Sequence, residues 1–318
     1  MKMTDLSNPQ KKESFKKNKS ILLSFLILAL SAFVSVFLSP YITKYTVDGL
    51  HLCANTIIGS VFPFLILTDV IVGFARFDSI GWLRLLFEKL FKINGYAITA
   101  YAVGLICGFP LGVKVAVDLY NRGFISKDEC ERLMGFSNNT GPAFVIGGVG
   151  FALRGSIKDG IILYFSMLIS SVFSGFIIGL GKDSTSGRAE REYEISYDFT
   201  SSVKNAATNT LNICAFVVFF SVICGILSLV IKNGAVYSIL VSISEVSNAA
   251  KALARSPYPR SINLALTSFA ISFSGVSVHT QARCFVYGTD LSMKRYWGAK
   301  IIQGITASAI TSILTFLL

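Results

Sequence analysis

Two lysines, Lys114 and Lys251, are the residues of this chain best placed to do chemistry, because each lies in an apolar stretch. Lys114 follows Gly-Phe-Pro-Leu-Gly-Val, and Lys251 follows Val-Ser-Asn-Ala-Ala. A charge at membrane depth is costly, so it marks a functional site unless it is paired or reaches an interface. Two such lysines in matching positions predict one binding site for an anion near a two-fold axis.

A polar, helix-breaking segment follows each lysine after 23 positions, at Ser137 and at Ser274. From about residue 108 to residue 180, adding 137 to a residue number gives its partner in the second half. A break frees backbone N–H and C=O groups, and polar side chains beside it can orient a ligand. The candidate ligand-orienting residues are Ser137, Asn138, Asn139 and Thr140 in the first break, and Ser274, Ser277 and His279 in the second.

Other roles are open for the same residues. Lys114 can instead pair with Asp118, and Lys251 with Glu245. Glu245 is then either a lysine partner or a ligand of a coupling ion, and Asn248 beside it joins the candidate binding residues. The polar residues of the first break can merely cap a helix end, and those of the second can satisfy a kink. The imidazole of the second break can contact the ligand, pack in the core or carry a proton.

The composition is that of an integral membrane protein. The chain has 318 residues, of which 53% are hydrophobic and 15% charged, against about 25% charged in a soluble domain. The net charge of +11 is explained by cytoplasmic loops, which collect Lys and Arg, so no nucleic-acid partner is expected. Five runs approach the roughly 20 apolar residues that span a bilayer: 21–39, 56–75, 159–181, 210–231 and 296–318.

Neither a metal site nor an enzyme centre is indicated. The six cysteines have no paired or metal-like spacing, and there are only two histidines. No HExxH motif and no suitable Ser/His/Asp arrangement is present. We therefore expect no cofactor and no enzyme activity, and we interpret the cysteines as small packing residues.

The expected fold is an all-α integral membrane fold with about seven full crossings, built as an inverted repeat with two re-entrant hairpins and two broken transmembrane helices. The hairpins are expected at 95–125 and 235–257, where Gly, Pro and polar residues interrupt or end the apolar runs, and the broken helices at 126–150 and 261–288. The chain divides into a basic cytoplasmic tail (1–20), a first transmembrane helix with an interfacial segment (21–55), a first repeat (56–181), a polar cytoplasmic loop (182–204) and a second, inverted repeat (205–318).

Each half has three crossings, and this odd number turns the second half upside down relative to the first. With the N-terminus in the cytoplasm, the expected cytoplasmic segments hold about 21 of the 29 Lys and Arg residues, as the positive-inside rule requires. One of these segments, 76–93, has the pattern of an amphipathic helix on the membrane surface.

The motifs around these residues resemble those of the YlbJ family of sporulation integral membrane proteins, also called SpoVV. They are Gly-Phe-Pro-Leu-Gly-Val-Lys114 with Asp118-Leu-Tyr, residues 135–144, and Gly-Val-Ser-Val-His279-Thr-Gln281, within a resemblance that covers about residues 50–310. The resemblance implies a nucleoside-recognition Gate domain, similar in plan to the concentrative nucleoside transporters. It also implies a place in the outer forespore membrane, facing the mother cell, where the family is implicated in moving dipicolinic acid. The sodium motif of the nucleoside transporters does not match these positions.

The sequence therefore favours a transporter of a small anionic metabolite, above all dipicolinate, whose two carboxylates would neutralise both lysines. A nucleoside or other neutral-solute carrier and a non-transporting sporulation scaffold are the alternatives. The lipid bilayer is the expected surrounding, and the plan leaves one face for self-association into a homo-oligomer.

Overall fold

The computed structural model describes residues 81–182 and 198–317 and, with gaps, residues between 22 and 67. This described part is helical and contains no strand, which confirms an all-helical membrane protein. The tail at 1–20 and much of the expected crossing at 56–75 lie outside the described residues. Among the described residues, four segments are long and apolar enough to cross a membrane: α8 (Ile157–Gly179), α9 (Phe199–Val230), α12 with α13 (Arg260–Val286), and α14 (Lys294–Leu317).

Two pairs of short helices lie at the positions expected for the hairpins. The first pair is α5 (Ile98–Ile106) with α6 (Leu111–Asn121), and the second is α10 (Gly234–Ser244) with α11 (Val246–Ala254). The two helices of each pair pack against each other. At 1.5 Å per residue each helix is about 14 to 17 Å long, which is half of the hydrocarbon thickness.

The first break separates α7 (Lys127–Ser137) from the π-helix η4 (Ala143–Leu153). α7 begins with a capping box, in which the side chains of Ser126 and Glu129 each accept a hydrogen bond from the other's backbone N–H. The backbone is non-helical at 138–141, so four residues lose their place in a helical ladder.

The second break is shorter. α12 (Arg260–Phe273) and α13 (Gly275–Val286) are separated by Ser274 alone, which has a left-handed φ of 76°. Two consecutive left-handed residues, Ser274 and Gly275 (φ 73°), turn the chain without leaving a run of unpaired backbone groups. The remaining short elements are η1 (Cys53–Ile57), α4 (Gly81–Phe91) and η3 (Gly95–Ala97).

Helix α2 (Ser39–Leu52) runs antiparallel to α9. The hydroxyl of Tyr45 shares a hydrogen bond with Ser228 at 3.2 Å, while Cys53 donates to a carbonyl fourteen positions earlier on α9. The interfacial position expected for 41–55 stays a prediction. The segment packs lengthwise along an apolar, membrane-length helix, because its small residues fit against that helix.

Helix α9 begins at Phe199, six residues earlier than expected, and shortens the polar loop predicted for 182–204. The cause is local, because the carboxylate of Asp198 accepts hydrogen bonds from two backbone N–H groups of the first turn. Residues 183–197 of that loop lie outside the described part of the chain.

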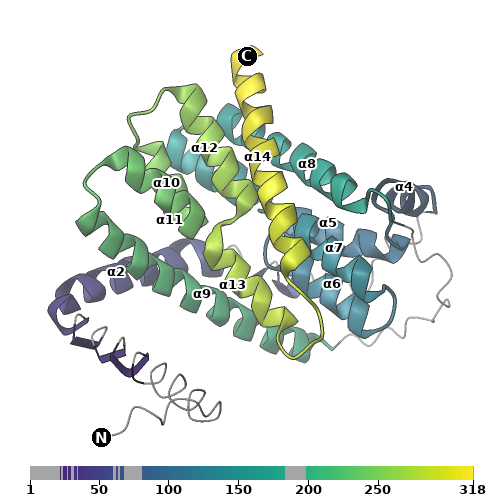
Figure 1. Cartoon of the computed structure of the whole chain (residues 1–318), viewed down its shortest axis with the longest axis horizontal. Coiled ribbons are helices and arrows are strands. Elements are labelled where there is room, and N and C mark those ends of the chain that lie inside the picture. Colours follow the sequence, from purple (N-terminus) through teal and green to yellow (C-terminus); the bar gives the residue numbers. More distant parts are fainter. Residues whose placement is uncertain are drawn as a thin grey trace, which may run out of the picture.

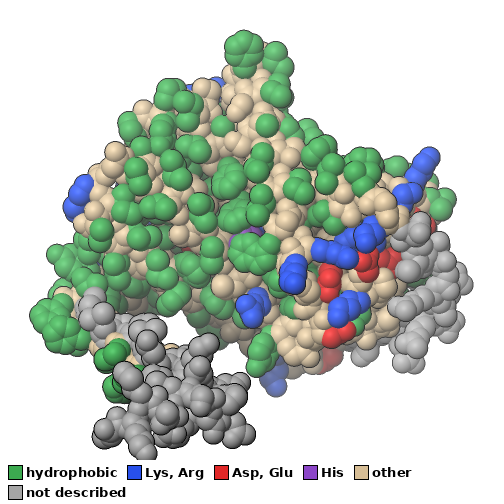
Figure 2. Space-filling view, in the orientation of Figure 1, with side chains coloured by type: hydrophobic (Ala, Val, Ile, Leu, Met, Phe, Trp, Pro, Cys, Tyr) green, Lys and Arg blue, Asp and Glu red, His purple; other side chains and the backbone are tan. Residues whose placement is uncertain are grey.

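Helix α14 runs through the middle of the molecule and packs against α12, α8 and α7 (Figure 1). Small residues allow this close packing: a Cβ on Gly135 of α7 would lie 2.3 Å from Ala299. Figure 2 shows apolar side chains over most of this face, with charged side chains gathered where α7 and α14 begin. On this face the charged side chains are therefore concentrated near helix starts, and the helix bodies present mainly apolar side chains.

Candidate functional site

The first hairpin touches the first break through glycines. A Cβ atom on Gly104 or Gly112 would lie 1.7 or 2.0 Å from the carbonyl oxygen of Ser137. Gly108, at the turn of the hairpin, has a φ of 88° and lies against Gly141. Any side chain would prevent this approach, so the glycines hold the hairpin turn against the non-helical backbone.

The second hairpin meets the second break in the same way but less tightly. A Cβ on Gly275 would lie 3.1 Å from the backbone nitrogen of Glu245, at the turn between α10 and α11. Glu245 is the N-cap of α11, and its carboxylate accepts hydrogen bonds from the backbone N–H groups of Ser247 (2.9 Å) and Asn248 (2.7 Å). Within the described residues its carboxylate bonds Ser247 and Asn248 and no lysine, so it stabilises a helix N-terminus rather than a lysine.

Both hairpin turns open onto one cavity, which we name the tip cavity. Its walls come from the turn of the first hairpin, the first break, the start of α11, and single faces of α9 and α13. Its polar lining residues are Thr140, Glu245, Ser247 and Gln281. Gln281 is buried, and its Oε1 atom has no hydrogen-bond partner within the described part of the chain. A buried amide oxygen without a partner at a cavity wall is suited to accept a hydrogen bond from a ligand.

An ammonium group from α14 lies at the first break. Lys300 is fully buried and donates from Nζ to the carbonyl oxygen of Asn138 (2.7 Å) and to Oε1 of Gln303 (2.8 Å). Gln303 in turn donates from Nε2 to Oδ1 of Asn139 (2.7 Å). Asn138 is the C-cap of α7, and a helix C-terminus has the negative end of the helix dipole. The lysine therefore stabilises carbonyl groups that the break has freed.

The same network reaches the second half through an aromatic pair. The hydroxyl of Tyr296 accepts a hydrogen bond from Nδ2 of Asn138 (2.7 Å) and bonds Nδ1 of His279 (2.8 Å). The imidazole also packs edge-on against Phe273, with ring centroids 4.7 Å apart. Its Nε2 atom is buried without a hydrogen-bond partner in the described residues. His279 therefore links the two breaks through Tyr296, without itself lining the tip cavity.

The residues predicted for the two breaks are all buried, but only some of them line the cavity. Thr140 lines it and also donates to the Ile271 carbonyl at 3.0 Å. The buried network contains Asn138, Asn139 and His279, while Ser137, Ser274 and Ser277 are buried beside the breaks. Thr140 is thus the one predicted residue of the first break that lines the tip cavity.

The two predicted lysines are not brought into one described cavity. Lys251 and Asn248 line a second cavity between α11, α2 and α9, which we name the α2 cavity. Lys114 lies on α6 and lines neither cavity. The ends of the two hairpins also contact different groups. In the last turn of α6, the hydroxyl of Tyr120 donates to Asp290 at 2.7 Å. The end of α11 instead joins a separate polar cluster, in which Asn263 donates to the Leu253 carbonyl.

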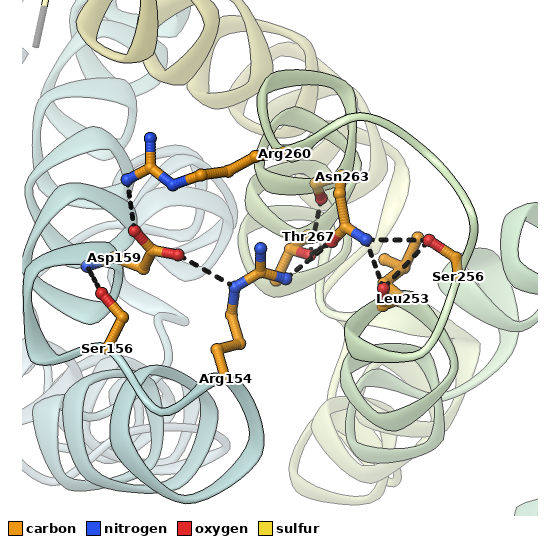
Figure 3. A network of polar contacts seen from close by, with 8 residues as sticks. All are labelled: Arg154, Ser156, Asp159, Leu253, Ser256, Arg260, Asn263 and Thr267. Atoms are coloured by element: carbon orange, nitrogen blue, oxygen red, sulfur yellow. Dashed lines mark hydrogen bonds and ion pairs between the residues drawn. The ribbon is translucent and has the colours of Figure 1, made fainter.

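That cluster joins the two halves near the start of α8 (Figure 3). Asp159 accepts hydrogen bonds from Arg154 (3.4 Å) and Arg260 (2.5 Å), and Arg154 also donates to Oδ1 of Asn263 (2.6 Å). Asp159 is only 5% exposed, and its ion pair with Arg154 is shielded from water, whereas the side chain of Arg260 is 52% exposed. The loop before α8 is therefore bound to the start of α12.

A second cluster makes the reciprocal connection. Arg295, at the start of α14, donates to Asp128 of α7, and the backbone N–H of Ser292 donates to Glu131 at 2.8 Å. The loop before α14 is therefore bound to the start of α7. The loops before α8 and α14 are thus arranged alike: each contacts the broken helix of the other half of the chain.

Sequence reasoning missed Lys300, Tyr296 and Gln303. The signal was present, since these residues are four and seven positions apart and share one face of α14 within the apolar run 296–318. A lysine inside a predicted crossing meets the same criterion that singled out the two hairpin lysines. The positive-inside argument instead assigns Lys300 to the cytoplasmic charges near the start of the last crossing.

Comparison with known proteins confirms the resemblance stated from the motifs. The chain is a distant homologue of the sporulation integral membrane protein YlbJ of Bacillus subtilis (strain 168), with 23% identity over 308 residues. The match covers 84% of this chain and 76% of that protein. No family model matches the chain. No solved structure matches it either.

Proposed function

We propose that this chain is a membrane transporter of small organic solutes and that the tip cavity is its binding site. The observation that carries the proposal is the meeting of both hairpin turns and the first break around one cavity. Transporters with broken helices bind their substrates where such breaks meet near the membrane midplane. The name of the relative, a sporulation integral membrane protein, supports a role of the proposed transport in sporulation.

An inverted repeat of about seven crossings, with two re-entrant hairpins, fits the element boundaries. α8 begins at residue 157 and α14 at residue 294, an offset of 137, which also relates Ser137 to Ser274 at the two breaks. Ser174, near the end of α8, donates to the carbonyl of Ala299 near the start of α14, so these helices run in opposite directions. The two reciprocal polar clusters are what a two-fold relation between the halves would produce.

The first candidate substrate is a small anion, most of all dipicolinate, carried across the outer forespore membrane. Lys251 supports this choice, because its ammonium group lines the α2 cavity beside Asn248, whose carboxamide bonds Glu245 of the tip cavity at 2.9 Å. A dicarboxylate would gain electrostatic attraction to that lysine as it enters or leaves.

A neutral solute such as a nucleoside is the second candidate, and a specific observation favours it. Glu245 is the charged residue that lines the tip cavity in the described structure, and no lysine or arginine lines it there. A carboxylate in a low-dielectric cavity repels an anion but accepts hydrogen bonds from sugar hydroxyls or base N–H groups.

A thermal-unfolding titration of the purified protein separates the two candidates. At 100 times its dissociation constant, a ligand stabilises the folded state by about 2.7 kcal/mol. Thr140→Val should abolish this stabilisation, while Thr208→Val, on an exposed face of α9, should leave it intact. If neither dipicolinate nor uridine stabilises the protein or enters vesicles that contain it, the proposal fails for both candidates.

The lysines test the anion candidate separately. Lys251→Ala should reduce dipicolinate uptake while uridine uptake, if present, is unchanged. Lys114→Ala should have the same effect only if both lysines serve one site. Normal dipicolinate transport by both variants would exclude the lysine pair from substrate recognition.

A further inference from the structure

The tip cavity is one of three cavities that lie in a row along α9. A third cavity, which we name the α13 cavity, is lined by Asn209, Asn212, Gln281 and Cys284 among others. It shares Ile213 and Gln281 with the tip cavity. The α2 cavity continues the row on the other side of the tip cavity, along the later part of α9.

The lining residues of α9 form one stripe. Asn209, Ile213, Val217, Ser221 and Ser228 line successive cavities and recur at helical spacing. From Asn209 to Ser228 the helix rises about 28 Å at 1.5 Å per residue, close to the roughly 30 Å of the hydrocarbon core. The stripe is thus long enough to cross the membrane.

The two junctions between the cavities are polar. Gln281 lies between the α13 cavity and the tip cavity, with its unpartnered buried Oε1 atom. Asn248 separates the tip cavity from the α2 cavity, because its Nδ2 atom bridges Glu245 (2.9 Å) and Ser221 of α9 (3.3 Å). The volumes of the α13, tip and α2 cavities are about 170, 90 and 460 Å³, so the tip cavity in the middle of the row has the smallest volume.

We propose that these three cavities are the path of the solute through the protein, with α9 as its fixed wall and Asn248 as the gate towards the α2 cavity. This inference deepens the proposed transport function and rests on it. The path is lined by amides and hydroxyls and by few charges, which suits a polar solute that must leave as readily as it binds. Asn248 closes the path by joining the second hairpin to α9 through a side chain that both partners can release.

Three native cysteines provide the test, since each cavity contains one: Cys284 in the α13 cavity, Cys107 in the tip cavity and Cys224 in the α2 cavity. Single-cysteine variants of the full chain would be placed in vesicles and treated from one side with a membrane-impermeant, charged thiol reagent. A variant that retains only Cys130 is the control, because that thiol is fully buried and donates to the Ala116 carbonyl of α6, away from the row.

Labelling of Cys284 from one side only and of Cys224 from the opposite side only is the expected result, with Cys130 unlabelled. Labelling of both from the same side would overturn the path, as would labelling of Cys107 by a small permeant reagent no faster than that of Cys130. These outcomes are distinct from failure of the transport proposal, which is judged by uptake through the unmodified chain.

The gate has its own test. Asn248→Ala should raise the rate of Cys107 labelling from the Cys224 side by about tenfold, the size expected when one hydrogen-bonded bridge no longer holds the path closed. Ser244→Ala is the matched control, because Ser244 is half-buried and its hydroxyl donates to the Leu240 carbonyl of its own helix. Equal labelling rates in the two variants would show that Asn248 is not the gate.

Discussion

The two breaks occupy equivalent positions in the chain but are built from different chemistry. The first leaves four residues, 138–141, outside a helix, and a buried ammonium and two amides hold them. The second leaves only Ser274 between two helices, and the chain turns there through the left-handed φ angles of Ser274 and Gly275. Subtracting 137 from Lys300 gives Leu163, which is fully buried in an apolar cluster. The two breaks thus share the spacing that the proposed repeat predicts, but different side chains surround them.

The length of each break explains the difference. A long break frees several carbonyl groups at the C-terminus of α7, and a buried cation with hydrogen-bond donors offsets their loss of partners. A one-residue break frees few groups, so an apolar residue on the facing helix is sufficient. The first break is accordingly the more polar of the two and lines the tip cavity through Thr140 and Gly141.

The largest expected effect comes from crowding the first hairpin. Gly104→Ala would place a Cβ atom 1.7 Å from the backbone oxygen of Ser137, which cannot move without displacing the break. We expect a loss of about 3 kcal/mol or more in the free energy of unfolding, beyond the usual range for overpacking. The readout is the yield of folded, monodisperse protein in detergent, which should fall. Gly147→Ala, where nothing lies within 4 Å, is the control and should fold normally.

Removing the cation from the first break should have the next largest effect. Lys300→Met leaves the Asn138 carbonyl and Oε1 of Gln303 buried without this donor, at about 1–3 kcal/mol for each unsatisfied group. Transport should be abolished, as measured by solute uptake. Leu163→Met, the equivalent position of the other half, should cost less than about 1.5 kcal/mol and retain uptake. Equal effects of the two changes would mean that the breaks do not differ in the way described.

The second break should tolerate change better. Gly275→Ala and Gly288→Ala both place alanine at a positive φ, which costs about 1–2 kcal/mol. Only at Gly275 would the new Cβ also press on the second hairpin, 3.1 Å from Glu245, whereas nothing lies near Gly288. Thermal unfolding should therefore show a larger loss for Gly275→Ala. A loss equal to that of Gly288→Ala would show that the second hairpin is not held against its break.

The smallest expected effect concerns the charged cluster beyond the breaks. A hydrogen bond from the Tyr120 hydroxyl, together with Lys127, keeps the pKa of the Asp290 carboxyl below its usual value. The lowered pKa stabilises the folded state above the unfolded pKa, and this contribution is lost as pH falls through the folded pKa. Asp290→Asn should therefore be slightly less stable than the unchanged chain at neutral pH and equal to it in strong acid. Thermal unfolding across that pH range measures the difference, and Tyr120→Phe should reproduce most of it.

Much of the fold could be predicted because its signals are local. The capping box at Ser126, the polar run after Ser137 and the glycines of the first hairpin each act within a few residues, and the helices begin and end there. Two boundaries were missed for equally local reasons. Asp198 starts α9 early, and Glu245 starts α11 by accepting hydrogen bonds from the backbone N–H groups of Ser247 and Asn248.

The site was harder to predict, because its members come from distant parts of the chain. Asn138 and Lys300 are 162 positions apart, and no periodicity in the sequence pairs them. The two hairpin lysines were predicted because they occupy matching positions in the chain. Lys300 has no charged counterpart, because the position 137 residues earlier is Leu163. Symmetry in the sequence therefore pointed away from the cation that the structure buries most deeply.

The sequence by itself determined that this is a helical membrane protein and where its helices break, because hydrophobic length and local capping act along the chain. Only the tertiary structure decided which polar groups meet. The burial of Lys300, the position of Lys251 in the α2 cavity and the hydrogen bond from Asn248 to Ser221 depend on helices that pack across the fold. The energy of a charge is set by its neighbours in space, and those neighbours are fixed only when the helices pack.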